Sequence, residues 1–135
     1  MTFDSWVEQI PDEIKGDSLW QMQLYRQALF LGEIAWFDSS KLLQDRRTIR
    51  TADQLYRATG KISSNIAEGY SRNGDVELYR FLQIAISSAN ELKYHLLLAH
   101  NLNYIKHLED KSITENLVEV KRMLASFMKK LRADS

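Results

Sequence analysis

Apolar residues along most of the chain recur three and four positions apart, the period of an α-helix with one buried face. The pattern occurs in four segments joined by short connections, so neighbouring helices are expected to run antiparallel. The sequence therefore predicts an all-α fold, an antiparallel up-down-up-down four-helix bundle over residues 18–135. The predicted helices cover about residues 18–44, 46–68, 75–101 and 112–132.

The same spacing predicts which side chains each helix buries. The inward residues are Leu24, Ala28, Leu31 and Ala35 in the first helix, and Ile49, Ala52, Tyr56, Thr59, Ile62 and Ile66 in the second. They are Leu78, Leu82, Ala85, Ala89, Leu92, Leu96 and Ala99 in the third, and Ile113, Leu117, Val120, Leu124, Phe127 and Leu131 in the fourth. Each helix is thus expected to bury one face against the others.

Several residues are typical of helix ends or close helix contacts. Ser18 and Gln21 have capping-box spacing, so the first helix is expected to begin at Asp17 or Ser18. Gly69 is expected to end the second helix in a left-handed conformation, which a residue without a Cβ atom adopts easily. Gly60 costs up to ~1 kcal/mol relative to Ala inside a helix, so a close helix–helix contact is expected there.

The first 17 residues stand apart from this pattern and contain the only proline, Pro11. Their apolar residues include Phe3, Trp6, Val7 and Ile10. We interpret residues 1–17 as an N-terminal arm, a short helix followed by a turn near Gly16. Two alternatives are open: an arm that packs on the bundle or on a neighbouring chain, and a partly ordered tail.

Composition narrows the class of protein. The 135 residues are 44% hydrophobic and 27% charged, which is typical of a globular domain with a substantial core. The absence of cysteine excludes disulfides, thiolate zinc sites and cysteine nucleophiles. The longest apolar runs are a few residues, far short of the ~20 that a membrane-spanning helix needs. With an acidic N-terminus that lacks a signal-peptide pattern, a cytoplasmic protein is expected.

The sequence contains no recognisable catalytic or cofactor motif. A Gly-x-Ser-x-Gly elbow, a P-loop and a dinucleotide fingerprint are all missing. The histidines are His95, His100 and His107, and none belongs to a Glu-x-x-His pair of the kind that builds di-metal sites in helix bundles. Glu91 and His95 share a helix face, but one pair does not complete a metal shell. We therefore expect no enzyme, no metal and no cofactor.

Charge is unevenly distributed although 18 basic and 18 acidic residues balance. Residues 1–45 carry eight acidic and three basic groups, whereas residues 46–61 carry five basic and one acidic. Successive residues of an α-helix are rotated by about 100° around its axis, which places four basic residues of the second helix on one narrow face: Arg46, Arg50, Arg57 and Lys61. We call this face the basic stripe, and Arg47 lies at its border.

Three interpretations of this basic stripe are open. It is a solvated helix face, or it follows a phosphate backbone with Tyr56 and Tyr70 available for stacking. In the third interpretation, it pairs with the acidic residues 1–45 of an adjacent subunit.

A second polar feature is the segment Asn65-Ile66-Ala67-Glu68-Gly69 followed by Arg72. Glu68 lies in the last turn of the predicted helix, where the helix dipole disfavours an anion. It is therefore expected to have a cationic partner, either Arg72 or an arginine of another helix or chain. Asn65 is expected to bond across to the next helix. Two interpretations of this segment are open: a polar cap within the chain and a contact between subunits.

This segment resembles the most recognisable motif of bacterial four-helix-bundle proteins of the 23S rRNA intervening-sequence family. Further segments resemble the family's pattern in the same order: Gln54-Leu55-Tyr56-Arg57-Ala58, Arg80-Phe81-Leu82-Gln83-Ile84-Ala85, and Glu91-Leu92 through Leu98-Ala99 with Leu102-Asn103-Tyr104-Ile105. The resemblance covers about residues 20–131 and leaves the N-terminal arm outside.

The resemblance implies a cytoplasmic bacterial bundle that assembles as a ring-shaped homopentamer. It also implies kinship with the accessory variability proteins of diversity-generating retroelements, similar pentamers that bind nucleic acid and a reverse transcriptase through a strongly basic surface. This chain departs from the family at Tyr56, where an arginine is usual, and at Ser87, where a glycine is usual. No proline separates the first two helices, and the pI is about 6.8.

Two functions are predicted from these observations. The first is a non-catalytic, self-assembling scaffold or adaptor whose ring presents surfaces to a protein partner. The alternative is a nucleic-acid-binding accessory subunit that uses Arg46, Arg47, Arg50, Arg57, Lys61 and Arg72. The neutral overall charge favours the first, since a nucleic-acid binder is expected to be clearly basic.

Overall fold

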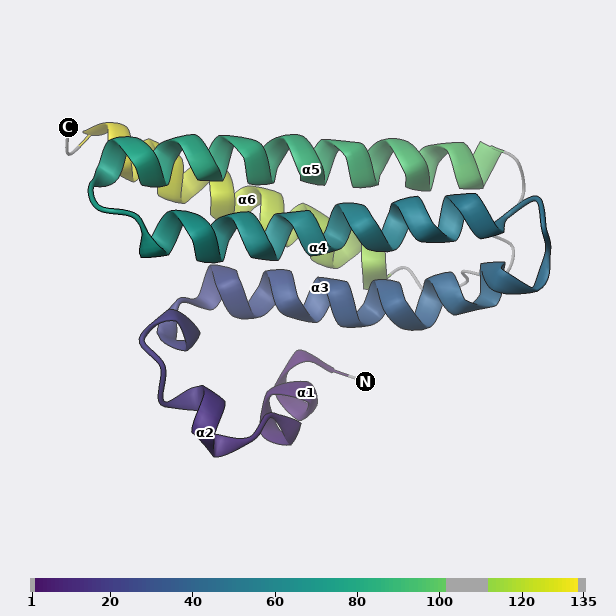
Figure 1. Cartoon of the computed structure of the whole chain (residues 1–135), viewed down its shortest axis with the longest axis horizontal. Coiled ribbons are helices and arrows are strands. Elements are labelled where there is room, and N and C mark those ends of the chain that lie inside the picture. Colours follow the sequence, from purple (N-terminus) through teal and green to yellow (C-terminus); the bar gives the residue numbers. More distant parts are fainter. Residues whose placement is uncertain (1, 102–111, 134–135) are drawn as a thin grey trace.

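The computed structural model describes residues 2–101 and 112–133, and these are helical with no β-strand among them (Figure 1). The predicted all-α fold class is therefore confirmed. The α-helices are α1 (Phe3–Gln9), α2 (Asp12–Lys15), α3 (Gln23–Ser40), α4 (Ile49–Ser71), α5 (Asp75–Asn101) and α6 (Ser112–Ala133). Two 3₁₀-helices precede and follow α3: η1 (Leu19–Gln21) and η2 (Lys41–Gln44).

Each of the four long helices packs against two others. Helix α4 contacts α3 and α5, and α6 contacts the same two helices from the other side. In Figure 1 the long helices lie side by side, and the chain reverses between α3 and α4 and again between α4 and α5. Since α3 and α5 each meet both α4 and α6, all four helices enclose one interior.

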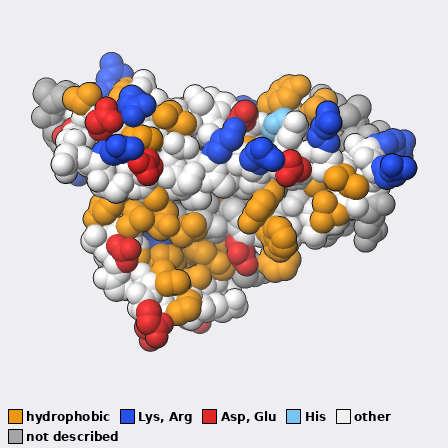
Figure 2. Space-filling view, viewed as in Figure 1, with side chains coloured by type: hydrophobic (Ala, Val, Ile, Leu, Met, Phe, Trp, Pro, Cys, Tyr) orange, Lys and Arg blue, Asp and Glu red, His pale blue; other side chains and the backbone are white. Residues whose placement is uncertain are grey.

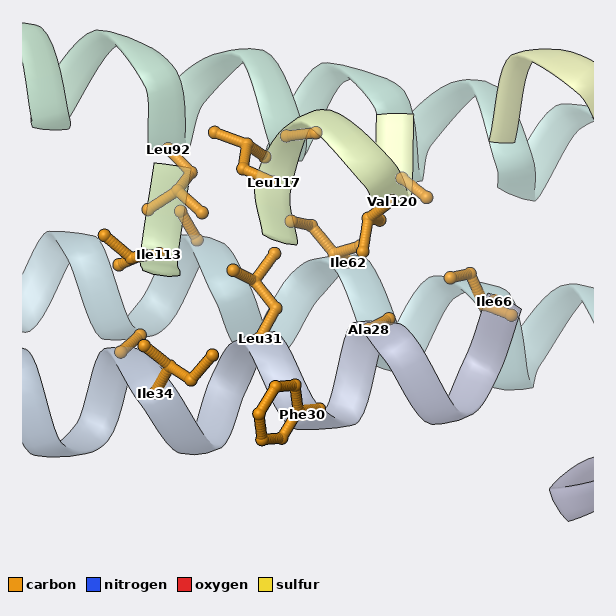
Figure 3. Packing of buried hydrophobic residues seen from close by; sticks show 14 of the residues in the cluster. Ala28, Phe30, Leu31, Ile34, Ile62, Ile66, Leu92, Ile113, Leu117 and Val120 are labelled. Carbon is orange, nitrogen blue, oxygen red and sulfur yellow. The ribbon is translucent and has the colours of Figure 1, made fainter. Parts of the chain in front are cut away.

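The interior is filled by apolar side chains from every long helix. Figure 3 shows Leu31 of α3, Ile62 of α4 and Leu117 of α6 directed into the same space. Leu92 of α5 is also completely buried. Removing a side chain of this size from water contributes about 1.5–3 kcal/mol. Burial of these amphipathic faces is thus the main force that holds the helices together.

The predicted buried face of α4 is correct in part. Ala52, Thr59 and Ile62 are buried, but Ile49 and Tyr56 are each 44% exposed. At 100° per residue these two lie about 120–140° around the helix from Ile62, too far to face the same interior. The predicted stripe, with its spacings of three and four residues, therefore leaves the core at Ile49 and Tyr56 and faces the outer side of α3 there.

The expected role of Gly69 is wrong. The helix continues to Ser71, and the glycine that adopts a positive φ after it is Gly74, at φ 96°. Gly69 is buried where α4 packs on α5, and a Cβ atom built on it would lie 2.8 Å from Cβ of Phe81. The close helix contact expected at Gly60 is also wrong within the chain, since a Cβ atom there would meet no atom within 4 Å.

Helix α1 packs on α3 of its own chain. Helix α1 begins with a capping box between Thr2 and Ser5. Its Trp6 is buried, 5.4 Å from the ring centroid of Phe30 on α3 and 5.9 Å from that of Trp20. Aromatic contacts of this kind contribute beyond the buried area.

The predicted capping box at Ser18 is wrong, because Ser18 caps no helix with its side chain. Asp17 accepts the hydrogen bond from the backbone N–H of Leu19 instead, at 2.9 Å. The long helix α3 then begins only at Gln23, so the chain turns through η1 first.

Helices long and apolar enough to cross a membrane do not occur in the described part of the chain.

We expect Gly69→Ala to lower the free energy of unfolding by about 1–2 kcal/mol. The added methyl group overpacks the contact with Phe81 at a cost of ~1–3 kcal/mol, and the better helix propensity of Ala offsets up to ~1 kcal/mol. Gly60→Ala is the matched control in the same helix and is expected to raise the stability by up to ~1 kcal/mol. Urea denaturation at one fixed protein concentration measures both, and equal effects of the two substitutions would contradict this role of Gly69.

Candidate functional site

Four cations of the predicted basic surface have carboxylate partners. The ion pairs join Arg47 to Asp45 at 2.9 Å, Arg57 to Asp53 at 3.3 Å, Lys61 to Glu91 at 3.2 Å and Arg72 to Glu68 at 2.6 Å. All of these side chains are well exposed, so each pair contributes little to stability. The pairs do, however, offset much of the positive charge that the sequence places on this face.

Asp45 organises the start of α4. Its carboxylate accepts hydrogen bonds from the backbone N–H of Arg47 at 2.8 Å and from the Arg47 guanidinium at 2.9 Å. These contacts lower the pKa of the Asp45 carboxyl below its ordinary value. The buried hydroxyl of Thr48 donates to the backbone carbonyl of Leu42 and so ties α4 to η2. The connection between η2 and α4, which contains Arg46 and Arg47, is thus fixed by the contacts of Asp45 and Thr48.

The motif over residues 65–69 forms contacts within its own chain. Asn65 donates to the carbonyl of Lys61 at 2.7 Å, so the expected bond to the next helix is wrong. Glu68 pairs with Arg72, one of the partners expected for it, and the Arg72 guanidinium lies 5.3 Å from the ring centroid of Phe81. Ile66 is completely buried, and Ala67 is half-buried. The motif therefore fixes the end of α4 against α5.

An open groove, which we call the α3–α4 groove, lies between the C-terminal part of α3 and the N-terminal part of α4. It has a volume of about 660 Å³, and its main lining residues are Trp36, Leu43, Arg46, Ile49, Arg50 and Tyr56. Trp36 and Tyr56 meet edge to face, with ring centroids 5.1 Å apart. Trp36 and Leu43 are 56% and 53% exposed. The chain thus presents an apolar surface to solvent at this end.

The apolar surface extends along α3 toward the N-terminal arm. Trp36 and Tyr56 also border a second hollow of about 430 Å³, which is lined in addition by Gly32 and Gly60. Cβ atoms built on these two glycines would meet nothing within 4 Å, so the surface is open there. Figure 2 shows hydrophobic side chains exposed along the α3 side in the right half of the view, with Lys and Arg side chains over α4 above them.

Arg46 and Arg50 differ from the other cations of the stripe. Both are exposed and line the groove, and neither forms an ion pair within residues 2–101 and 112–133. The groove therefore combines exposed aromatic and aliphatic side chains with two positive charges at its rim.

Sequence reasoning did not single out Trp36 or Leu43. A usable signal was present, because Trp36 follows Ala35 directly and neighbouring residues of a helix lie about 100° apart. Since Ala35 is inward, at least part of the Trp36 side chain had to face away from the core. A large apolar residue directly after a buried one therefore indicates exposed apolar surface at Trp36.

The histidines do not gather into a metal site in the part of the chain that the structure describes, and no group of three or more metal-ligating side chains occurs there. Glu91 pairs with Lys61, and the His95 ring contacts Tyr94 edge to face at 5.2 Å. The side chain of His100, the whole of His107 and the predicted motif at Leu102-Asn103-Tyr104-Ile105 lie outside the described residues.

The chain is similar to one protein family in sequence and to solved structures in fold. A family model described as 23S rRNA-intervening sequence protein matches residues 21–126. A crystal structure of a protein of unknown function from the S23 ribosomal protein family of Bacteroides thetaiotaomicron is similar in fold, with a TM-score of 0.72 and 24% sequence identity. The similarity covers 78% of this chain and 98% of that one. No curated protein matches the sequence.

We expect the Asp45–Arg47 contact to stabilise the folded chain only while Asp45 is ionised. Because the folded-state pKa is lowered, the stabilisation is present above the ordinary aspartate pKa and is lost as the pH falls through the folded value. Urea midpoints of the natural chain and of Asp45→Asn should therefore differ at pH 7 and converge below about pH 4. A difference that widens toward acid would contradict this assignment.

Proposed function

Because the chain belongs to the 23S rRNA-intervening sequence protein family, we propose that it is a non-catalytic, self-assembling scaffold or adaptor. Its unit is an antiparallel up-down-up-down bundle of α3, α4, α5 and α6, with residues 1–17 as an arm. The bundle assembles into a ring-shaped homo-oligomer, a pentamer by family resemblance, and acts in the cytoplasm. The ring presents composite surfaces to a protein partner.

The α3–α4 groove is the observation that carries this proposal. Large contiguous apolar surfaces on soluble chains mark sites that another molecule covers. In this chain Trp36, Leu43, Ile49 and Tyr56 come together at one end of the molecule while the core is already filled by other residues. Although Trp36 and Tyr56 contact each other, these side chains are outside the buried core and about half exposed, which supports a role in assembly.

The contact pattern of the long helices supports the bundle as the unit of assembly. Helices α3, α4, α5 and α6 form a closed set in which every helix touches two others. A patch that lies on one edge of such a unit does not meet itself across a ring, because a ring needs two different patches that complement each other. The groove is the first of these patches.

We expect the natural chain to form a homo-oligomer and Ile49→Glu to dissociate it. The substitution replaces apolar contact surface with a carboxylate, which loses its hydration when a second chain covers it, and a buried ion pair with Arg46 or Arg50 recovers that loss only with ideal geometry. Static light scattering at micromolar concentration measures the mass directly. Val76→Glu is the matched control, because Val76 is exposed at the start of α5 and lines no groove described above. A monomeric natural chain would overturn self-assembly.

A second candidate function is binding of single-stranded nucleic acid. Arg46 and Arg50 are the cations of the stripe without an ion-pair partner in the described ranges, and Trp36 and Tyr56 lie beside them. Aromatic side chains next to cations are the arrangement that stacks bases and contacts phosphates. The pairing of Arg47, Arg57, Lys61 and Arg72 with carboxylates supports the scaffold more strongly.

Titration with RNA and DNA at low and moderate salt tests this alternative. Counterion release makes a phosphate contact weaker as salt rises, so binding through Arg46 and Arg50 would fall steeply with salt. The scaffold proposal predicts that neither the natural chain nor a variant with Arg46→Glu and Arg50→Glu binds RNA or DNA in a salt-dependent way. Salt-dependent binding that this double variant abolishes would favour the nucleic-acid function instead.

A further inference from the structure

The outer side of the N-terminal arm has properties that complement the groove. Ile14 is 52% exposed, and it follows the exposed carboxylates Asp12 and Glu13 in α2. Residues 2–17 carry five acidic side chains and one basic one. The arm's aromatic side chains Phe3 and Trp6 are engaged with α3, so Ile14 and these carboxylates are on a part of the arm that its own chain leaves uncovered.

The groove offers the opposite chemistry. Leu43 and Ile49 supply exposed aliphatic surface, and Arg46 and Arg50 place two cations beside it. An aliphatic side chain that directly follows two carboxylates, with Lys15 after it, therefore matches an aliphatic groove with two guanidinium groups. Charge complementarity of this kind selects one partner and orientation among many.

These two surfaces cannot meet within one chain. Helix α2 packs on η1, directly before α3 begins, and Figure 1 shows it near the N-terminal end of α3. The groove is lined by the C-terminal part of α3, at the other end of that helix. The 18 residues of α3 span about 27 Å. The contact of Trp6 with Phe30 holds α1 against α3 and keeps the arm at its own end of the bundle. An arm that reaches a groove must belong to another copy.

We propose that the arm of one chain docks into the α3–α4 groove of a neighbouring copy, with Ile14 against Leu43 and Ile49 and with Asp12 and Glu13 toward Arg46 and Arg50. This inference rests on the proposed self-assembly and names the two surfaces that meet. Each chain then uses its arm in one contact and its groove in another. Such a head-to-tail arrangement closes into a ring when the rotation per subunit is suitable.

The docking involves a part of the chain that the family model does not include. The matched region begins at residue 21, after the arm. The contact therefore adds to whatever surfaces the matched region provides. Because its charged groups lie at the protein surface, it weakens as salt rises.

Disulfide cross-linking tests the docking directly, because the natural chain has no cysteine. Ile14→Cys and Leu43→Cys are made in separate chains, mixed and oxidised gently. We expect a disulfide-linked dimer of the two variants on a non-reducing gel. Val118→Cys replaces Leu43→Cys as the control, since Val118 is an exposed aliphatic residue of α6 outside the groove, and it should cross-link at least several-fold less.

A charge exchange separates specific docking from collision. Asp12→Lys with Glu13→Lys on the Ile14→Cys chain should reduce the cross-link several-fold, because like charges then meet at the groove. Arg46→Glu with Arg50→Glu on the Leu43→Cys chain should restore it. Failure of this restoration, or equal cross-linking to Val118→Cys, would overturn the docking.

Light scattering on the same samples distinguishes the two proposals. An oligomer without the Ile14–Leu43 cross-link would overturn the docking and leave self-assembly standing. A monomer would overturn both.

Discussion

Helices α4 and α5 pack closely where the hydrogen of Gly69 faces the side chains of Phe81 and Leu78. A methyl group in place of that hydrogen would lie 2.8 Å from Cβ of Phe81, so the two backbones approach at a distance that only glycine permits. The ion pair of Glu68 with Arg72, whose guanidinium also lies over Phe81, closes the same end. This contact fixes the rotation of α4 about its own axis, and the roles of its other residues depend on that rotation.

With its rotation fixed, α4 divides its residues among three surroundings. Ile62 and Ile66 enter the core, Lys61 reaches Glu91 on α5, and Tyr56 lies against Trp36 at the edge of the α3–α4 groove. The buried stripe holds α4 against the other long helices. The exposed apolar stripe does not, and it is the physical basis for regarding the chain as one subunit of a larger assembly.

The sequence predicted the α-helical class and the bounds of α5 and α6 well, because long periodic segments leave few alternatives. It predicted the groove poorly. Ile49 and Tyr56 fit an inward stripe by spacing alone, and only the packing of Leu55 and its neighbours against the other helices shows that the core is already full without them. A glycine near the end of a helical pattern is expected both at a helix end and at a close helix contact. For Gly69, only the position of Phe81 shows that it is a helix contact.

The central claim is that a second copy covers the α3–α4 groove, and the exposure of Trp36 reports on it most directly. Trp6→Phe with Trp20→Phe leaves Trp36 as the single fluorescent tryptophan. Acrylamide quenching of this variant is then measured over a range of protein concentrations. Quenching is expected to weaken as the concentration rises and subunits associate. Strong quenching that is the same at every concentration would contradict it.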